Sequence, residues 1–301
     1  MNSCLYEALS RELPGIVLSA EEPLSAHTSF HIGGPAEVMA FPKTVKELSG
    51  LLKLSEKWDM KPVILGAGTN VLAPDEGLRG LVICTRDSFD GVRQISETEL
   101  EADCGVTLKK AAMLARDLSL SGLEFAHGIP GTVGGGVYMN AGAYGGELKQ
   151  VVTKTTVMNL DGSVETVAGE AQGFSYRHSA FMERDCIIVS ASFCLQMGVF
   201  DDIRARMREL SEKRRASQPL ELPSAGSTFK RPVGGYAATL IEQAGLKGFR
   251  IGGAAVSEKH AGFVVNMGGA TAQDVKNLIE EVKKRVYGNA GILLEPEVRI
   301  L

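Results

Sequence analysis

A glycine-rich stretch in the middle of the chain places the tightest limit on what this sequence can fold into. Residues 128–147 hold eight glycines in twenty positions, interleaved with Ile, Pro, Val, Tyr and Met. A flexible linker would be polar and rich in serine, so we expect this stretch to be ordered and packed. Glycines also cluster elsewhere among the 35 in the chain. Clustered glycine beside apolar strands indicates backbone that approaches a ligand closely.

A second, shorter glycine loop follows a strand predicted at 62–65, and it comprises Gly66, Ala67, Gly68, Thr69 and Asn70. It lacks the third glycine of the G-x-G-x-x-G dinucleotide fingerprint, because position 71 is valine. Pro74 and Gly77 also leave no room for a crossover helix before the next predicted strand, at 81–85. We expect a nest of backbone N–H groups able to hold a pyrophosphate, with the Thr69 hydroxyl and the Asn70 amide as further donors. Taken alone, an ordinary tight turn is an equally good interpretation.

Length, charge and cysteine usage exclude several function classes. A chain of 301 residues suits two or three lobes. A net charge of -4 gives no general attraction to nucleic acid or acidic membranes, and no apolar run approaches the roughly 18 residues of a membrane span. The start of the chain lacks a secretory signal pattern, and the five cysteines have no C-x-x-C spacing. We expect a soluble, reduced, cytoplasmic protein without a disulfide framework or a structural zinc site. The histidines show no metal-ligand spacing, so no metal is predicted.

Hydrophobic periodicity predicts helices and strands without a strict βαβ rhythm, which favours the α+β class over a doubly wound sheet. Helices are predicted at 44–58 (with a Thr44–Glu47 capping box), after Thr107, after Phe200, and at 271–287 with Gly288 beyond its end. Strands are predicted at 62–65 and 81–85, in a hairpin from Val151 that turns at Asp161-Gly162, and in a buried run at 186–195. We expect a boundary between lobes at Pro219 and Pro223.

Three short motifs hold reactive side chains. Arg177 lies in the aromatic segment 174–181, Ser227 follows a glycine in 224–232, and Glu297 lies in the final segment, 294–299. Each residue also has a purely structural interpretation. Arg177 could be a surface cation stacked on Tyr176, Ser227 a helix cap, and Glu297 an exposed strand residue. The residue types alone favour these structural roles.

Taken together, the motifs resemble the UDP-N-acetylenolpyruvoylglucosamine reductases, the flavoenzymes that complete UDP-N-acetylmuramate in bacterial cell-wall synthesis. Matching segments run from 28–36 to 294–299, almost the whole chain, and the long glycine motif is the most specific of them. His31, where many relatives carry Arg, and Thr69, where Ser is common, are mild departures. Without a long insertion between Leu195 and Pro219, the chain resembles the shorter type of the family, which lacks an extra loop over the substrate.

The resemblance implies a two-lobed FAD-binding fold of the vanillyl-alcohol-oxidase (PCMH) type, followed by a smaller α/β substrate-binding lobe. The expected FAD-binding lobes are 1–58 and 59–196, and the expected substrate lobe is 197–291, with the final strand 292–301 returning near the active site. The resemblance also implies non-covalent FAD, with NADPH as co-substrate. The residues expected to hold FAD are Gly66, Ala67, Gly68, Thr69, Asn70, Gly128, Ile129, Pro130, Gly131, Thr132, Gly134 and Gly135.

The family's three catalytic positions fall on Arg177, Ser227 and Glu297. In the implied reaction, a hydride from flavin N5 adds to C3 of UDP-N-acetylglucosamine enolpyruvate, and Ser227 protonates C2 as a proton donor, not as a nucleophile. The charge that develops on the enolate and carboxylate must be stabilised. Arg177 can fork onto that carboxylate, and a protonated Glu297 can hydrogen-bond it. The expected contacts to the rest of the substrate are Tyr144, Tyr176, Lys230, Arg231 and Arg299.

Two other functions remain open at this point. An FAD-dependent alcohol or sugar oxidase of the same fold would be reduced by its substrate and would react rapidly with oxygen. A binding module would hold a nucleotide without chemistry. Arg177, Ser227 and Glu297 suit an acceptor carboxylate, so the reductase is favoured. No nucleic acid or membrane partner is expected, and the chain is expected to be a monomer or a weak dimer.

Overall fold

The chain folds into two compact units, each assembled from segments that are distant in sequence. The computed structural model describes residues 4–86 and 88–301. Unit 1 comprises the described parts of Met1–Glu21, Glu37–Ala67 and Arg79–Lys213, and unit 2 comprises Glu22–Ala36, Gly68–Leu78 and Arg214–Leu301. The short glycine loop therefore passes from unit 1 to unit 2 between Ala67 and Gly68.

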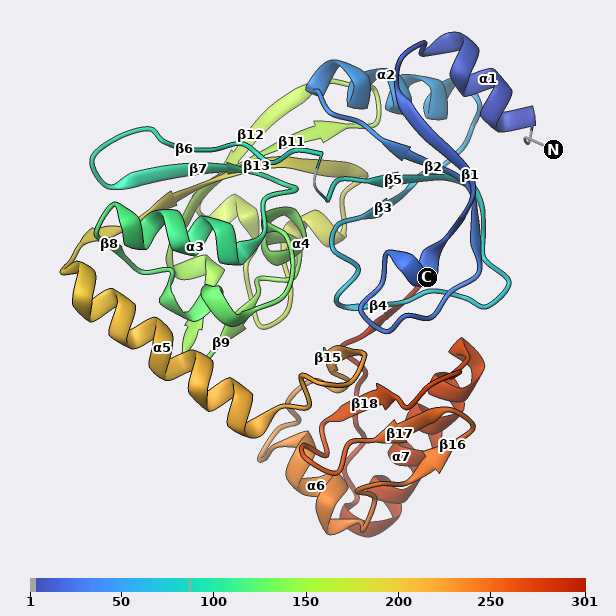
Figure 1. The fold of residues 1–301 in the computed structure, drawn as a ribbon, viewed down its shortest axis with the longest axis vertical. Helices are drawn as coiled ribbons and strands as arrows, with labels where there is room; N and C mark the ends of the chain where they lie inside the picture. The colour runs from blue at the N-terminus through green and yellow to red at the C-terminus, as the bar shows by residue number, and fades with distance from the viewer. Residues whose placement is uncertain (1–3, 87) are drawn as a thin grey trace. The chain divides into compact units, whose positions relative to one another are not determined.

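Unit 1 is organised around two larger sheets (Figure 1). The first has the order β1-β2-β5-β3, formed by Val17–Pro23, Pro35–Phe41, Leu78–Cys84 and Val63–Leu65. The second has the antiparallel order β12-β11-β13-β7-β6, formed by Val164–Ala168, Val152–Asn159, Cys186–Cys194, Glu99–Asp103 and Val92–Gln94. Two short pairs complete the unit: β9 (Gly142–Ala143) with β10 (Gly146–Glu147), and β8 (Leu120–Ser121) with β14 (Gln196–Met197).

Helices of unit 1 bury apolar residues in the core of the unit. They are α1 (Cys4–Glu12), α2 (Val45–Lys57), α3 (Leu108–Asp117), α4 (Val133–Tyr138) and the greater part of α5 (Phe200–Ser217). Helix α4 packs on β13 and β7, with α3 beside it (Figure 1). The buried faces of the helices and the inner strand β13 share one apolar core. Each fully buried leucine in such a core stabilises the fold by about 1.5–3 kcal/mol.

Several elements predicted from the sequence are confirmed. Thr44 caps α2 by accepting a hydrogen bond from the Glu47 N–H (3.1 Å). The Glu47 carboxylate accepts from the Lys43 N–H (2.7 Å), one residue before the cap, so the expected reciprocal bond is displaced by one position. Thr107 caps α3, the β11–β12 hairpin turns at Gly162, and Ile203, Met207 and Leu210 form the buried face of α5.

The loop between β3 and β5 confirms that the short glycine segment is no Rossmann crossover. Strands β3 and β5 are parallel neighbours, with Val63 opposite Val82. Residues 66–77, which join them, contain β4 (Val71–Leu72) and no helix. A βαβ unit needs a crossover helix of about a dozen residues, so this connection belongs to a different architecture.

Unit 2 is a four-stranded antiparallel sheet covered by a long helix (Figure 1). The sheet has the order β15-β18-β17-β16, formed by Ser224–Ser227, Phe263–Asn266, Ala254–Val256 and Arg250–Ile251. Helix α7 (Ala272–Ala290) packs on β16 and β17, and α6 (Ala237–Gln243) contacts α7. The last strand, β19 (Arg299–Ile300), lies parallel to β4, with Arg299 opposite Val71.

Buried contacts join the three segments of unit 2. Phe30 and Leu72 belong to the same apolar core as the inner face of α7. The Asn266 amide donates to the Phe30 carbonyl (2.9 Å). The Asp75 carboxylate accepts from the N–H groups of Ala272 (2.7 Å) and Gln273 (3.1 Å) and so caps the start of α7. Residues 22–36 and 68–78 are therefore integral to the fold of unit 2.

The predicted end of the last helix is wrong. Helix α7 continues through Gly288 to Ala290, and the glycine that ends it is Gly291, which has φ +66° and donates to the Tyr287 carbonyl (2.8 Å). An exposed glycine inside a helix costs about 1 kcal/mol relative to alanine. That cost is too small to stop a helix whose inner face remains buried through Val286. Within the described ranges, no helix combines the length and the apolar character needed to cross a membrane.

The two glycines at the end of α7 give a matched test of this boundary. A Cβ at either position would meet open space, so the two substitutions differ only in backbone conformation. We expect Gly288→Ala to raise the free energy of unfolding by about 0.5–1 kcal/mol. Gly291→Ala should lower it by about 1 kcal/mol, because alanine is disfavoured at positive φ. Urea unfolding of both variants measures the difference, and equal shifts would contradict the boundary.

Candidate functional site

The two glycine loops come together in unit 1 at the hydroxyl of Thr132. Thr132 is the N-cap of α4, and its Oγ1 accepts from the Gly135 N–H (3.4 Å). A Cβ added to Gly66 would lie 2.6 Å from this same oxygen, so no side chain fits there. Gly135 is exposed, and a Cβ there would have Thr132 Oγ1 as its nearest neighbour, at 3.6 Å. Gly66, Thr132 and Gly135 thus form a close contact between the two loops in which two of the three residues carry no side chain, and we call this contact the glycine cradle.

Gly134, in the first turn of α4, allows the helix to pack closely on Cys104. A Cβ at Gly134 would lie 2.9 Å from the Cβ of Cys104, on the strand side of the helix. The N–H groups of Val133 and Gly134 donate to the carbonyls of Val106 (2.7 Å) and Cys104 (2.9 Å). These two N–H groups are therefore already hydrogen-bonded within the protein. Donors for a phosphate must come from other residues of the loops. The role predicted for Gly134 in cofactor binding stays a prediction.

The remainder of the short loop belongs to unit 2. At position 68 of this loop, only glycine fits. It has φ +60°, and a Cβ there would lie 2.0 Å from the His27 carbonyl oxygen. The Gly68 carbonyl accepts from the Ser29 N–H (3.0 Å). The loop is thus held at close range by the 22–36 segment, and Thr69 and Asn70, both partly buried, follow directly.

A bulge in β15 presents Ser227. Ser224 pairs with Val265 and Ser227 with Phe263, so three steps along β15 oppose two along β18. Gly226, with φ +74°, supplies the left-handed residue at this irregularity. The next residue, Thr228, is buried and accepts from the Val264 N–H (2.9 Å), while Ser227 is exposed. Bulges re-aim side chains in this way, often beside active sites.

Glu297 lies beside this bulge, in the same unit. Its N–H donates to the Thr228 carbonyl (2.8 Å), and its own carbonyl accepts from the Asn70 amide (3.2 Å). The Asn70 carbonyl in turn accepts from the Arg299 N–H (3.0 Å). The structure therefore brings together four predicted site residues from three distant parts of the sequence: Asn70, Ser227, Glu297 and Arg299.

The other basic residues predicted for the substrate lie near the same bulge. The Lys230 N–H donates to the Glu295 carbonyl (2.8 Å), and its ammonium pairs with the Glu295 carboxylate. The Arg231 guanidinium lies 4.4 Å from the centre of the Tyr236 ring. Lys230 and Arg231 are the cations nearest to Ser227 in sequence. Each contacts another residue of unit 2: Lys230 pairs with Glu295, and Arg231 stacks on Tyr236.

Arg177 occupies the tip of a tight turn in unit 1. Ser175 and His178 close the turn by two backbone hydrogen bonds (3.1 and 3.2 Å), and Arg177 has φ +54°. Its guanidinium lies 5.1 Å from the centre of the Tyr176 ring and donates to the Gly142 carbonyl (3.0 Å). Gly142 opens the β9–β10 hairpin, whose tip carries Tyr144. The predicted residues Tyr144, Tyr176 and Arg177 therefore lie on adjoining turns.

Asn140 was missed by the sequence analysis. It is fully buried, has φ +42°, and its amide donates to the Ser175 carbonyl at the base of the Arg177 turn (2.9 Å). An asparagine at the end of a glycine-rich helix is a weak signal for a left-handed residue. Nothing in the sequence indicates which segment, 35 residues further on, it contacts.

The acidic, histidine and cysteine side chains of residues 4–86 and 88–301 form no metal centre. No group of three or more such residues in the described ranges could hold a metal ion. Two histidines next to predicted motifs make ordinary contacts: His178 Nε2 lies 3.1 Å from the Glu183 carboxylate, and His127 Nδ1 lies 3.3 Å from Ser211 Oγ. Burial, with added repulsion from Lys109 and Arg116, lowers the pKa of His127 and favours its neutral form.

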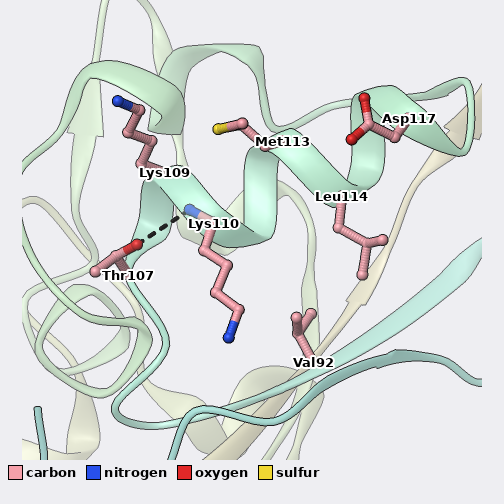
Figure 2. Close-up of a pocket in the computed structure, with 7 residues that line it drawn as sticks. All are labelled: Val92, Thr107, Lys109, Lys110, Met113, Leu114 and Asp117. Atoms are coloured by element: carbon pink, nitrogen blue, oxygen red, sulfur yellow. Dashed lines mark hydrogen bonds between the residues drawn. The ribbon is translucent and has the colours of Figure 1, made fainter. Parts of the chain in front are cut away.

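A pocket of about 360 Å³ lies elsewhere in unit 1, along the exposed side of α3. Figure 2 shows Met113, Leu114 and Val92 around it, with Lys109 and Lys110 at the start of the helix. The Lys110 ammonium bonds to the carbonyl of Asp90 (2.7 Å). None of the predicted site residues lines this pocket.

Known proteins resemble this chain over nearly its whole length. Two family models match: "FAD binding domain" over residues 36–168 and "UDP-N-acetylenolpyruvoylglucosamine reductase, C-terminal domain" over residues 218–301. The UDP-N-acetylenolpyruvoylglucosamine reductase of Syntrophomonas wolfei is 43% identical over 297 residues, covering 99% of each chain. The crystal structure of the reductase (MurB) from Thermus caldophilus is 32% identical, with a TM-score of 0.79 over 95% of this chain and 98% of that one.

A more distant likeness concerns the fold alone. The BBE-like 1 protein of Physcomitrella patens is 14% identical, with a TM-score of 0.50 over 64% of this chain and 44% of that one. With the FAD-binding model and the Thermus structure, it confirms the predicted fold class, an α+β chain with the FAD-binding fold of the vanillyl-alcohol-oxidase type.

The contact between Gly134 and Cys104 can be tested by thiol labelling. Burial raises the pKa of the Cys104 thiol to about 12, so its thiolate fraction at pH 8 is on the order of 10⁻⁴. We expect the exposed Cys4 and Cys194 to react first in the native protein, and Cys104 last. Gly134→Ala forces its new Cβ against Cys104 and should speed labelling of Cys104 at least tenfold.

Gly135→Ala is the matched control, because its Cβ meets only an ordinary 3.6 Å contact. It should leave labelling of Cys104 unchanged. Peptide mapping after timed labelling identifies the modified cysteine. Equal labelling in the two variants would contradict the packing role of Gly134.

Proposed function

Because the chain belongs to the UDP-N-acetylenolpyruvoylglucosamine reductase family, we propose that it reduces UDP-N-acetylglucosamine enolpyruvate to UDP-N-acetylmuramate, with NADPH as electron donor. The chain is an FAD-dependent oxidoreductase, and the resemblance seen in its motifs is confirmed. One observation supports the proposed roles of individual residues. The backbone of Glu297 is hydrogen-bonded to Thr228, next to the Ser227 bulge, and to the Asn70 amide.

The glycine cradle supports non-covalent binding of FAD. Gly66 and Gly135 carry no side chain where the two loops meet, and the backbone of Gly135 is exposed, so no side chain from either position blocks the approach of a pyrophosphate. We propose that residues 66–70, 128–132, 134 and 135 hold the cofactor. When bound, FAD accepts electrons from NADPH and supplies from N5 the hydride that reaches C3 of the enolpyruvyl group.

Arg177 is proposed to bind the substrate carboxylate. Its guanidinium stays cationic and can make two parallel hydrogen bonds to a carboxylate, which a lysine ammonium cannot reproduce. Addition of a hydride at C3 leaves negative charge on C2 and the carboxylate, so a fixed cation there stabilises the transition state more than the ground state. The closed turn of Ser175 and His178 and the bond to Gly142 fix this cation in advance.

Ser227 and Glu297 are proposed to complete the reaction. The exposed Ser227 hydroxyl gives its proton to C2, so that C2 gains its hydrogen from Ser227 and C3 gains its hydrogen as the hydride. A serine hydroxyl is a weak acid, but an enolate is a strong base. Glu297, in its protonated form, donates a hydrogen bond to the carboxylate and adds to the stabilisation by Arg177.

The remaining assignments are part of the same proposal. Lys230, Arg231 and Arg299 are cations near Ser227 in unit 2 and suit the diphosphate, whereas Tyr144 and Tyr176 offer aromatic faces in unit 1. We retain the lobes 1–58 and 59–196 for FAD and 197–291 for the substrate, with the final strand 292–301 contributing Glu297 and Arg299. A cytoplasmic location fits a peptidoglycan precursor that carries a nucleotide.

Separate half-reactions test the proposed function. Under anaerobic conditions, NADPH should bleach the flavin absorbance, and UDP-N-acetylglucosamine enolpyruvate should restore it. Ser227→Ala should leave bleaching unchanged and slow the recovery by about 10²–10⁴-fold, the usual contribution of a positioned proton donor. Ser224→Ala, on the same strand, is the control and should recover at the wild-type rate.

Each alternative gives a different result in this experiment. Bleaching by an alcohol or sugar, with rapid reoxidation by oxygen, would establish the oxidase. A protein that binds the nucleotide but shows no flavin absorbance even after addition of FAD would be a binding module. Recovery of Ser227→Ala at the wild-type rate would overturn the proton-donor role.

The glycine cradle gives a separate prediction for the cofactor. Gly66→Ala places a methyl group 2.6 Å from Thr132 Oγ1, so one of the two loops must shift. We expect the dissociation constant for FAD to rise at least tenfold, measured by quenching of flavin fluorescence on titration. Gly288→Ala, at an open position of α7, is the control. Wild-type affinity in a folded Gly66→Ala protein would contradict the assignment of the cradle.

A further inference from the structure

Two short segments of unit 1, 138–142 and 175–179, are joined by three hydrogen bonds that run between alternate residues. The first segment leaves α4 and enters the β9–β10 hairpin, and the second is the Arg177 turn. The bonds are Ser179 Oγ to the Tyr138 carbonyl (2.7 Å), Asn140 Nδ2 to the Ser175 carbonyl (2.9 Å), and Arg177 Nη2 to the Gly142 carbonyl (3.0 Å). We call this set the Arg177 clamp.

Asn140 is the central member of the clamp, and three hydrogen bonds hold its side-chain amide. Its Nδ2 donates to the Ser175 carbonyl and to Glu147 Oε2 (both 2.9 Å), and its Oδ1 accepts from the Lys149 N–H (2.9 Å). The residue is fully buried, with φ +42°, a conformation that asparagine tolerates better than most residues. A buried amide whose two donors and one acceptor are all bonded within the protein holds its partners in one arrangement.

The conformation of the Arg177 turn needs such support. Arg177 has φ +54°, which costs about 1–2 kcal/mol for a residue with a side chain. Backbone strain of this kind persists only where the surrounding structure fixes it. The bond from Asn140 to Ser175 holds one side of the turn, and the buried Ser179 holds the other.

We propose that Asn140 is a positioning residue for Arg177. Its hydrogen bond to the Ser175 carbonyl sets the orientation of the turn. Because Asn140 lies two residues before Gly142, it also sets the position of the Gly142 carbonyl, which accepts from the guanidinium. Arg177 is then ready for a substrate carboxylate before the substrate binds. This inference rests on the carboxylate-binding role proposed for Arg177. A misplacement of about 1 Å can cost a reaction on the order of 10²-fold.

Asn140→Asp is the principal test, because it preserves size and tolerance of positive φ. It keeps the oxygen that accepts from Lys149 but replaces the donor Nδ2 with an oxygen that faces the Ser175 carbonyl and the Glu147 carboxylate. We expect recovery of the reduced flavin by the enolpyruvyl substrate to slow 10- to 100-fold. Bleaching by NADPH and the FAD content should stay within twofold of the wild type. Asn140→Gly, which removes the amide without adding charge, should show the same selective loss.

Gln172→Glu is the matched control in the same unit. Gln172 is also a buried amide, and its Nε2 donates to the Thr153 carbonyl (3.2 Å), while its Oε1 accepts from Thr155 (2.7 Å). The substitution makes the same chemical change but breaks no bond of the Arg177 clamp. It should lower the melting temperature to a similar degree and leave the rate of recovery unchanged. Equal slowing in Gln172→Glu and Asn140→Asp would overturn the positioning role.

A double-mutant cycle separates this inference from the proposed function. If Asn140 acts through Arg177, then Asn140→Asp should have less than a threefold effect in an Arg177→Ala background. Full additivity would overturn the positioning role. Wild-type recovery in Arg177→Ala alone would overturn the proposed role of Arg177 itself. Slow recovery in Arg177→Ala beside fast recovery in both Asn140 variants would overturn only the inference about Asn140.

Discussion

The organisation of unit 1 depends on the close approach of Gly66 to the hydroxyl of Thr132. This approach is possible because Gly66 has no side chain. A Cβ at Gly66 would come within 2.6 Å of this oxygen, so the two loops can meet only because one of them carries no side chain. The same hydroxyl caps α4, and the first turn of that helix packs on Cys104 at Gly134. One residue thus links a loop that leaves the first sheet to a helix that lies on the second.

Local signals in the sequence predicted the regular elements well. A capping threonine, a periodic apolar face and a turn glycine act within a few residues, and they gave α2, α3, the β11–β12 hairpin and the buried strand β13 near their observed positions. The end of α7 was misplaced because two glycines compete there. Burial of Val286 continues the helix past Gly288, and only the conformation of Gly291 reveals which glycine ends it.

Contacts between distant segments could not be predicted from residue types. Composition gives no reason for residues 22–36 to join the fold of unit 2, yet Phe30 is buried in its core and bonded to Asn266. The motif around Glu297 was visible in the sequence, but its proximity to Asn70 comes from the pairing of β19 with β4. Asn140 shows the same limit, since its partner Ser175 lies 35 residues further along the chain.

Two of the three proposed catalytic residues, Arg177 and Ser227, lie at or directly after a residue with left-handed backbone. Arg177 has positive φ itself, and Ser227 directly follows Gly226, which has φ +74°. In regular helices and strands, side chains follow fixed directions along the element, whereas a left-handed residue can turn one side chain out of that pattern. The conformation is costly for arginine and nearly free for glycine. Ser227 therefore needs little support beyond its strand, whereas Arg177 requires the surrounding hydrogen bonds that unit 1 supplies.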